Sequence, residues 1–288
     1  MLSASRTAVL FPGQGSQTPG MRDEVRPDLL DAVCELVGDD PFARVDESTA
    51  FAQPAIFCAS ISSWGRIADR VDPVALAGHS LGEMTALSAA GALDERDALE
   101  LVVLRGKLMA SAGEASGGGT MLAVLRGTPA RAAALAARHG VTVANDNAPD
   151  QVVLSGARGA LEGAGNDARA QGLRAMMLDV AGAFHSPQME AAVAPFAAAL
   201  AKVEFRTPRI KVVSCATVTE LTDPRTQLAY ALTSPVRWRE TMTALADDGV
   251  KTFVDAGPGR VLAKLAPRNV ADASAAPAAS LLEPARAA

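Results

Sequence analysis

Residues 73–83 read Pro73-Val-Ala-Leu-Ala-Gly-His-Ser-Leu-Gly-Glu83, a short apolar run that ends in a G-x-S-x-G pattern. The run is typical of a buried strand, and residues 83–90 have the composition of a helix. A serine between such a strand and helix lies on a tight turn that raises its hydroxyl clear of the sheet. The glycines permit close backbone approach, and the helix N-terminus favours developing negative charge. We therefore predict that Ser80 is a nucleophile, the alternative being a surface turn that happens to contain serine.

Strands and helices alternate on both sides of this turn. Another apolar run, residues 7–11, precedes a Pro-Gly-Gln-Gly-Ser loop, and helical patterns cover 28–37, 53–70 and 95–110. Further along come a helix near 188–202, a strand at 210–214, a helix near 234–248 and a strand at 252–255. This alternation predicts an α/β fold, α/β-hydrolase-like, whose parallel sheet is covered on both faces.

The middle of the chain follows a different order. Strand, helix, strand, strand, helix and strand patterns succeed one another between 121 and 180, which is the order of a ferredoxin-like lobe. We predict a large α/β domain made of 1–120 and 182–288, with a small ferredoxin-like lobe at 121–181 inserted into it. The Ala/Pro-rich sequence after about residue 271 is expected to be a mobile tail.

Composition limits the classes of function. The formal net charge of −5 argues against general nucleic-acid binding, and no uninterrupted apolar run reaches the ~18 residues of a membrane span. Three widely separated cysteines lack metal-ligand spacing and indicate buried thiols in a reducing compartment. Because the first residues also lack a secretory signal pattern, we expect a soluble, cytoplasmic protein that holds no metal ion.

A serine nucleophile needs a base, and the chain has three histidines. His79 adjoins Ser80 on the sharp turn, where structural packing is the better interpretation, and His139 ends an Ala-rich helix before a glycine. Elimination leaves His185, in a loop between the small lobe and the next helix, as the predicted base. No histidine follows His185 and no His-Gly-Gly-Gly motif precedes Ser80, which argues against an ordinary α/β-hydrolase lipase.

Six motifs in order resemble those of the malonyl-CoA:acyl carrier protein transacylases and the related acyltransferase domains of polyketide synthases. The resemblance covers about 8–265, nearly the whole chain. The motifs are Phe11-Pro-Gly-Gln-Gly-Ser-Gln17, Gly78-His-Ser-Leu-Gly-Glu83, Leu104-Arg-Gly-Lys-Leu-Met109, Ala183-Phe-His-Ser186, Ser234-Pro-Val-Arg-Trp238 and Gly257-Pro-Gly-Arg-Val-Leu262. The family's small lobe also agrees with the inserted β-α-β-β-α-β order.

The resemblance implies a role for each matching residue. Ser80 would form an acyl-enzyme ester, with His185 as general base and then acid. The backbone N–H groups of Gln14 and Leu81 would form the oxyanion hole. Arg105 would bind the free carboxylate of a malonyl group, because a planar guanidinium grips both oxygens at once. Without the resemblance, Arg105 is better explained as a helix-surface charge.

Three further positions follow from the resemblance. A backbone carbonyl near Ala231, where many relatives carry glutamine, would orient His185 in place of a carboxylate. Asn145 matches a polar residue of the family's cleft, although turn chemistry explains an asparagine there equally well. Phe184 belongs to an Ala-Phe-His-Ser pattern that accompanies malonyl selectivity, because its ring would leave no room for an α-methyl group.

These features predict a ping-pong acyltransferase that moves a malonyl group from malonyl-CoA to the phosphopantetheine thiol of an acyl carrier protein. No metal or redox cofactor is implied, no nucleic acid or membrane takes part, and a monomer is the expected state. Carrier proteins are commonly acidic, so docking would need a local basic patch. Candidates that cluster in sequence, each equally explained by surface solubility, are Arg237, Arg239, Arg260, Lys264 and Arg268.

Two other functions stay open at this point. A hydrolase of the same fold could clear acyl groups from carrier proteins, but the presence of Arg105 favours transfer of a dicarboxylic acyl group. A non-catalytic docking subunit of a larger complex would have no chemical need for Ser80, His185 and Arg105 together. The sequence leaves the pathway open between fatty-acid synthesis, polyketide synthesis and malonate decarboxylation.

Overall fold

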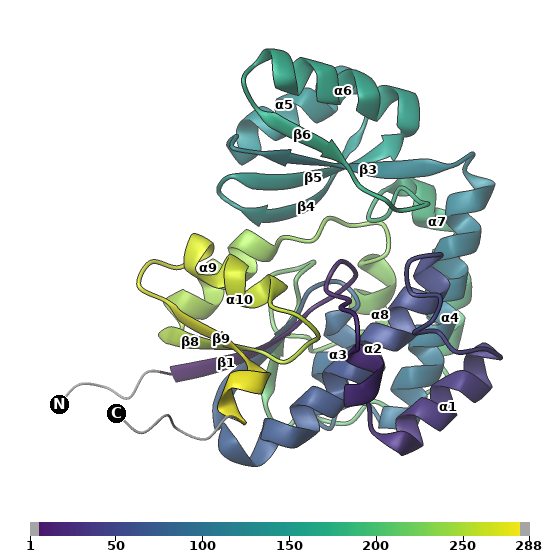
Figure 1. Ribbon diagram of the computed structural model, residues 1–288, viewed down its shortest axis with the longest axis vertical. Helices are drawn as coiled ribbons and strands as arrows, with labels where there is room; N and C mark the ends of the chain where they lie inside the picture. Colours follow the sequence, from purple (N-terminus) through teal and green to yellow (C-terminus); the bar gives the residue numbers. More distant parts are fainter. Residues whose placement is uncertain (1–5, 283–288) are drawn as a thin grey trace.

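A computed structural model describes residues 6–282, which form a larger α/β part with a smaller lobe above it (Figure 1). The larger part begins with β1 (Arg6–Phe11), α1 (Pro27–Val37), α2 (Thr49–Ile67), β2 (Pro73–Gly78), α3 (Gly82–Ala89) and α4 (Glu95–Ala115). After the lobe it continues with α7 (Glu190–Leu200), β7 (Lys211–Val213), α8 (Pro224–Tyr230), α9 (Trp238–Asp247), β8 (Val250–Asp255), α10 (Val261–Asn269) and β9 (Ser274–Pro277). Short 3-10 turns lie at 21–24, 68–70, 187–189 and 278–281.

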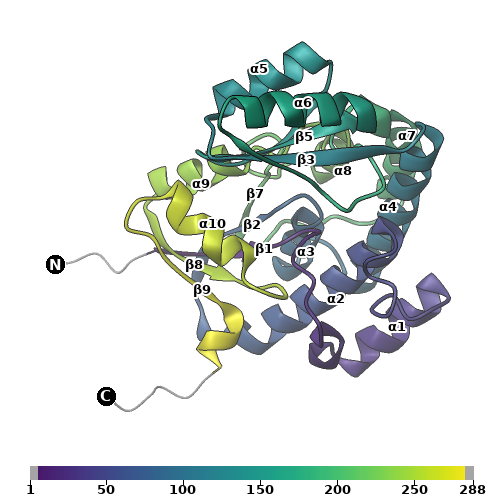
Figure 2. The same cartoon turned by 45° about the horizontal axis from the view of Figure 1, so that its top comes forward.

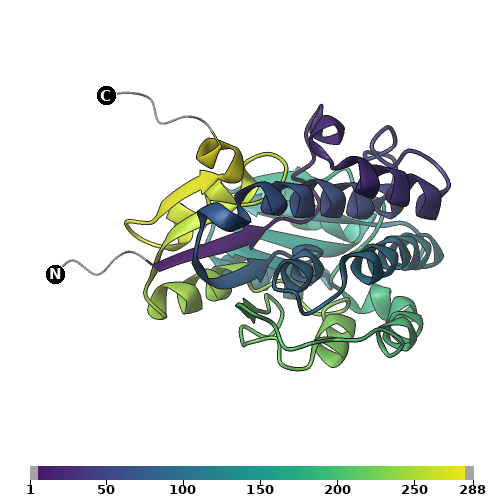
Figure 3. The same cartoon turned by 90° about the horizontal axis from the view of Figure 1, so that it is seen from below.

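The sheet of the larger part is parallel throughout, in the strand order β7-β2-β1-β8-β9. Successive side chains of the central strand, β1, point to opposite faces of the sheet. Both sets are buried because helices cover both faces. Val9 and Phe11 pack with residues of α2, α3 and α4, whereas Ala8 and Leu10 pack with residues of α9 and α10. Seen from below, the sheet lies between α2 and α9 (Figure 3). The predicted α/β class with both faces covered is confirmed.

The smaller lobe consists of β3 (Gly119–Leu125), α5 (Pro129–His139), β4 (Thr142–Ala148), β5 (Gln151–Ala157), α6 (Arg158–Ala170) and β6 (Arg174–Met177). Its strands are antiparallel in the order β4-β5-β3-β6, which is a ferredoxin-like arrangement as predicted. Leu122 and Val124 of β3 pack with α5 and α6. The alternate residues Met121 and Ala123 therefore face the larger part, below the lobe's sheet (Figures 1 and 2). The division at 121 and 181 remains a prediction.

Strand β4 fastens the lobe to the larger part. The N–H of Asp146 donates to the Val236 carbonyl and the N–H of Val236 donates to the Ala144 carbonyl, both at 2.8 Å. Arg239 forms an ion pair with the Asp146 carboxylate at 2.6 Å. Arg268 does the same with Asp150 at 2.5 Å and also donates to Gln151. These contacts fix the edge of the lobe above α9 and α10, and so they fix the roof of the space between the two parts.

The mobile tail expected after residue 271 is wrong for residues 274–281. Residues 274–277 form β9, which pairs in parallel with β8 from Thr252 to Asp255, and a 3-10 turn follows. An edge strand needs partners on one side only, so it tolerates the small residues of this segment and a proline at its end. Residues 283–288, which were also part of the expected tail, lie outside the described residues.

Within residues 6–282, no helix combines the length and the apolar character that a bilayer-spanning segment needs.

Candidate active site

Ser80 lies on a sharp turn between β2 and α3. Its φ angle is 54°, in the left-handed region that residues with a side chain seldom adopt. The flanking glycines make the turn sterically feasible. A Cβ on Gly78 would lie 1.9 Å from the backbone carbon of Gly82, and one on Gly82 would lie 2.0 Å from the carbonyl oxygen of Phe11. Both glycines of the G-x-S-x-G pattern are therefore required where they stand.

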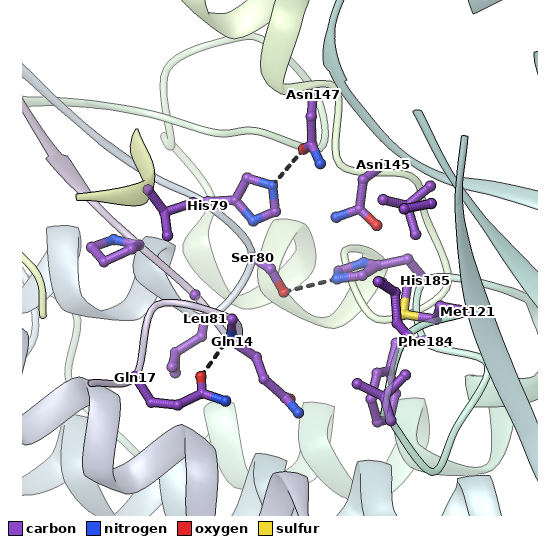
Figure 4. A pocket seen from close by; sticks show the side chains of 18 of the residues that line it. Gln14, Gln17, His79, Ser80, Leu81, Met121, Asn145, Asn147, Phe184 and His185 are labelled. Atoms are coloured by element: carbon purple, nitrogen blue, oxygen red, sulfur yellow. Dashed lines mark hydrogen bonds between the residues drawn. The ribbon is translucent and has the colours of Figure 1, made fainter. Parts of the chain in front are cut away.

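His185 reaches Ser80 from the loop after the small lobe. The Ser80 hydroxyl donates to His185 Nε2 at 2.8 Å, and the two side chains point toward each other (Figure 4). On the other side of the ring, Nδ1 donates to the carbonyls of Ala231 and Ser234, each at 3.0 Å. Two carbonyl acceptors require the proton on Nδ1, which leaves Nε2 free to accept the serine proton.

The surroundings keep the His185 imidazole neutral. Its side chain is buried, and this burial, together with the positive charge of Arg105 and then His79, lowers the pKa of His185 to about 3. An imidazole with such a pKa is ready to accept a proton over the whole neutral range.

Arg105 lies inside the site and not on the helix surface. Only 4% of the residue is exposed, and its guanidinium donates to Gln53 Oε1 at 2.6 Å and to Ser80 Oγ at 3.1 Å. Burial lowers the pKa of Arg105 to about 10, an effect that the charge of Glu83 partly offsets. The guanidinium stays protonated at neutral pH, and residues 6–282 give it no carboxylate in ion-pair contact. A buried cation of this kind favours an anionic ligand.

Gln14 and Leu81 line the same cavity as Ser80, and Leu81 is also its neighbour in the chain (Figure 4). Neither backbone N–H donates a hydrogen bond to any other residue of the described chain. The side-chain Oε1 of Gln14 accepts a hydrogen bond from the Thr49 hydroxyl at 2.9 Å. Two free donors next to a nucleophile can stabilise a developing oxyanion.

A cavity of about 470 Å³ opens between the lobe and the larger part, with Ser80 and His185 on its floor. The wall on the lobe side is apolar and consists of Met121, Ala123, Leu125, Val153, Met176, Leu178 and Phe184. The ring of Phe184 is buried beside His185 and Met121 (Figure 4). Asn145 also lines the cavity, and its buried Oδ1 has no hydrogen-bond partner among the described residues.

The other two histidines take structural positions. His79 packs on the ring of Trp238, with ring centroids 5.4 Å apart, and its Nε2 donates to Asn147 Oδ1 at 2.8 Å. His139 ends α5, and Gly140 follows in the left-handed conformation as expected, but His139 also contacts the Asp167 carboxylate at 2.9 Å. Among residues 6–282, no three His, Cys, Asp or Glu side chains gather closely enough to bind a metal ion.

Several residues that support the site are absent from the sequence predictions. Glu83 is buried and its carboxylate accepts from the Ser214 hydroxyl and the Cys215 N–H, while Cys215 Sγ accepts from the N–H of Ser80 at 3.3 Å. Burial raises the pKa of Glu83. Gln53 joins Arg105 from α2, which begins at Thr49 rather than at 53. The sequence signal that could have indicated this contact is a glutamine within a largely apolar helical stretch.

Comparisons with known proteins identify relatives over nearly the whole chain. A family profile described as an acyl transferase domain matches residues 32–285. The chain is 37% identical to the malonyl CoA-acyl carrier protein transacylase of Haemophilus influenzae, over 93% of each chain. It is 36% identical to a polyketide biosynthesis malonyl CoA-acyl carrier protein transacylase of Bacillus velezensis, over 93% of this chain and 98% of the relative. It also matches a polyketide synthase protein of Streptomyces orinoci, of which it covers 14%.

Solved structures show the same fold. The transacylase of Coxiella burnetii superposes with a TM-score of 0.89 at 31% identity, over 96% of both chains. A malonyl-transacylase in complex with its type II polyketide synthase acyl carrier protein gives a TM-score of 0.90 at 34% identity, over 96% of this chain and 98% of that one. With a family profile over most of its length and relatives of this identity covered almost end to end, the chain belongs to the acyl transferase family that includes the malonyl CoA-acyl carrier protein transacylases.

Proposed function

We propose that the protein transfers a malonyl group from malonyl-CoA to the phosphopantetheine thiol of an acyl carrier protein, through an ester on Ser80. The observation that carries this proposal is the meeting of three groups in one cavity: a serine hydroxyl 2.8 Å from a neutral imidazole, and a buried guanidinium 3.1 Å from the same hydroxyl. The hydroxyl and the imidazole are the nucleophile and the base that acyl transfer needs. The guanidinium would bind a carboxylate on the acyl group.

In the first half of the reaction, His185 Nε2 takes the proton of Ser80 while Oγ attacks the thioester carbonyl. The N–H groups of Gln14 and Leu81 would stabilise the tetrahedral oxyanion, a contribution typically of about 10²–10³ in rate for each donor. The C–S bond then breaks, and the CoA sulfur leaves with the proton held on His185. The product is a malonyl ester on Ser80.

The second half reverses these steps with another thiol. His185 takes the proton of the carrier's phosphopantetheine thiol, and the sulfur attacks the ester carbonyl. The ester C–O bond breaks, and Ser80 Oγ recovers the proton from His185. Because each thiol uses the same imidazole in turn, CoA has to leave before the carrier arm enters, which is the ping-pong order. No metal or redox cofactor takes part in these steps.

Substrate selection would rest on Arg105 and Phe184. Arg105 has N–H groups beyond the two that bond to Gln53 and Ser80, and a carboxylate on the acyl group would accept from these. Phe184 limits the space beside His185. Asn145, with an unpartnered oxygen at the cavity wall, would contact the bound acyl donor.

Of the five basic residues suggested above for binding the carrier protein, three are engaged in ion pairs. Arg237 is paired with Glu240, while Arg239 and Arg268 fasten the lobe through Asp146 and Asp150. Arg260, just before α10, and Lys264 on α10 are exposed and have no ion-pair partner among residues 6–282. Between them lies Val261, which is 38% exposed and lines the cavity mouth.

We infer that Arg260 and Lys264 contact the acidic surface of the carrier. Charge reversal at both positions should raise the KM for the carrier and leave acylation by malonyl-CoA unchanged. The same reversal at Lys202, which lies beyond the C-terminus of α7 and outside the cavity lining, is the control. Unchanged carrier kinetics in the Arg260/Lys264 variant would remove this contact from the proposal.

Intact-protein mass spectrometry after brief mixing with malonyl-CoA tests the main proposal. We expect a malonyl adduct that is absent in Ser80→Ala and that passes to a carrier protein on addition. Methylmalonyl-CoA and acetyl-CoA, run in parallel, report selectivity. Free malonate without an adduct or a loaded carrier would instead indicate a hydrolase, and no reaction with any donor would contradict both functions.

A further inference from the structure

A chain of three hydrogen bonds, the first two of them buried, links the guanidinium of Arg105 to the loop that carries the N–H of Gln14. Arg105 donates to Gln53 Oε1 at 2.6 Å, Gln53 Nε2 donates to the Thr49 hydroxyl at 2.9 Å, and that hydroxyl donates to Gln14 Oε1 at 2.9 Å. Thr49 and Gln53 are 5% and 2% exposed, so water does not compete for the first two bonds, whereas Gln14 at the end of the chain is exposed.

The direction of every bond in this chain follows from Arg105. A guanidinium only donates, so the amide oxygen of Gln53 has to face it and the amide nitrogen has to face Thr49. The Thr49 oxygen then accepts, and its own proton is left to point at Gln14. Gln53 Nε2 also lies 3.3 Å from Met109 Sδ, a weak acceptor that supports the same orientation. The chain therefore has one stable polarity, from the guanidinium to the loop.

Local packing brings the members of this chain together. Gly106, next to Arg105, lets α4 approach the first turn of α2, since a Cβ there would lie 2.9 Å from the carbonyl oxygen of Thr49. Thr49 and Gln53 are four residues apart, so they share one face of α2. A change in the distance between α2 and α4 would break this series of hydrogen bonds.

Gln14 lies in the loop at the far end of this chain of hydrogen bonds. Gln14 stands between Gly13 and Gly15. The Ser16 hydroxyl donates to the Gly13 carbonyl and the Gly15 N–H donates to Gln17 Oε1, so hydrogen bonds within the loop hold the backbone on both sides of Gln14. The only side-chain hydrogen bond that Gln14 makes to the rest of the described chain is the one to Thr49. This bond is therefore the side-chain contact that ties Gln14 itself to α2, in addition to the hydrogen bonds within the loop.

We propose that Thr49 is a positioning residue for the Gln14 N–H and that Gln53 is a positioning residue for Arg105. The inference rests on the proposed function. Gln53 suits its place because a neutral amide orients the guanidinium without neutralising it, which leaves the positive charge for the substrate's carboxylate. A glutamate at 53 would form an internal ion pair and compete with that carboxylate.

The two residues should differ in which substrates they affect. The oxyanion forms with every acyl donor, so Thr49→Val should slow acylation of Ser80 by malonyl-CoA and by acetyl-CoA by the same factor, about tenfold or more. Thr49→Ser keeps the hydroxyl and should restore the rate to within about threefold. Gln53→Leu disturbs the carboxylate contact, so it should slow malonyl-CoA at least about tenfold more than acetyl-CoA.

Single-turnover acylation followed by rapid quench and intact-protein mass spectrometry measures these rates. Thr85→Val is the matched control, because Thr85 is a fully buried threonine whose hydroxyl has no partner among the described residues. We expect this control to acylate at the wild-type rate. Thermal unfolding of each variant shows whether it is folded, and Thr49→Ala is the second variant if Thr49→Val is not.

Three results would overturn the proposal: equal rates for Thr49→Val and Thr49→Ser, an effect of Thr49→Val on malonyl-CoA alone, or an equal loss for both donors in Gln53→Leu. Acylation of Ser80 by p-nitrophenyl acetate separates this proposal from the proposed function, since it needs the oxyanion hole but neither CoA nor a carboxylate. A wild-type protein that reacts with this ester but takes no malonyl group would contradict the malonyl function, and Thr49→Val would still have to slow the ester reaction.

Discussion

Replacing Arg105 should separate the binding of the acyl carboxylate from the acylation chemistry. In the folded protein Arg105 is 4% exposed, and its guanidinium has N–H groups beyond those bonded to Gln53 and Ser80. A malonyl carboxylate that accepts two of these N–H groups makes two charge-assisted hydrogen bonds, each contributing about 1.5–3 kcal/mol. The sum of about 3–6 kcal/mol predicts that Arg105→Met lowers kcat/KM for malonyl-CoA by roughly 10²–10⁴.

The same change should have little effect on stability. Burial lowers the pKa of Arg105 from 12.5 to about 10, which corresponds to about 3 kcal/mol of unfavourable desolvation. Methionine removes that cost but leaves Gln53 Oε1 without a donor, a loss of about 1–3 kcal/mol. These contributions nearly cancel, so the urea midpoint of the variant should stay close to that of the wild type.

Steady-state kinetics with malonyl-CoA and acetyl-CoA checks this reasoning. Acetyl-CoA has no carboxylate, so its kcat/KM should stay within about tenfold of the wild-type value in Arg105→Met. Arg105→Lys keeps the charge without the planar pair of donors and should fall between the two. An equal loss with both donors, or a loss with malonyl-CoA below tenfold in a folded variant, would refute the assignment of Arg105 to the carboxylate.

Other residues give predictions of different kinds. Phe184→Ser should raise kcat/KM for methylmalonyl-CoA relative to malonyl-CoA by roughly 5–150-fold, because a steric exclusion of this size corresponds to about 1–3 kcal/mol; an unchanged ratio in competition assays would show that the ring does not set the limit. Asp255→Ala should lower the free energy of unfolding by about 1–3 kcal/mol, because Asp255 Oδ2 accepts from the N–H groups of Leu262 and Ala263 at the start of α10; urea titration measures this, and a shift below half a kcal/mol would contradict it. The acylation rate should stay flat from pH 8 to pH 5, because the pKa of His185 is about 3, whereas a histidine of ordinary pKa would lose about thirtyfold over that range. The free energy of unfolding, in contrast, should fall as the pH drops from 6.5 toward 3, because the unfolded chain protonates His185 more readily than the folded protein does.

Local patterns were sufficient to predict the strand, turn and helix around Ser80. The predicted strand at 73–77 and helix from 83 correspond to β2 and α3, because periodicity and glycine placement act over a few residues. The ferredoxin-like order of the lobe is predictable for the same reason. His185 lies 105 positions from Ser80 in the chain, and it was reached by elimination because only three histidines exist.

Elements without local signals could not be predicted. Helix α10 has no side-chain cap of its own, contains Pro267, and receives the carboxylate of Asp255 from the preceding strand at its first turn. Strand β9 is recognisable only from its pairing with β8. The series of hydrogen bonds from Arg105 to Gln14 likewise depends on tertiary structure, because it requires the packing of α4 against α2 at Gly106. Sequence alone placed Arg105 on a helix surface and relied on the family resemblance to move it into the site.

The buried guanidinium also explains why the base has an unusual environment. The pKa of His185 is lowered first by burial and then by the positive charge of Arg105. A carboxylate bound to Arg105 would neutralise this second effect, so the imidazole would become a stronger base when a dicarboxylic acyl group is in place. A neutral acyl group leaves the cation unpaired and the imidazole weaker. Under the proposed function, one buried arginine would act on selectivity twice, by attracting the carboxylate and by adjusting the basicity of His185. A cation on the helix surface would do neither, because water would screen it.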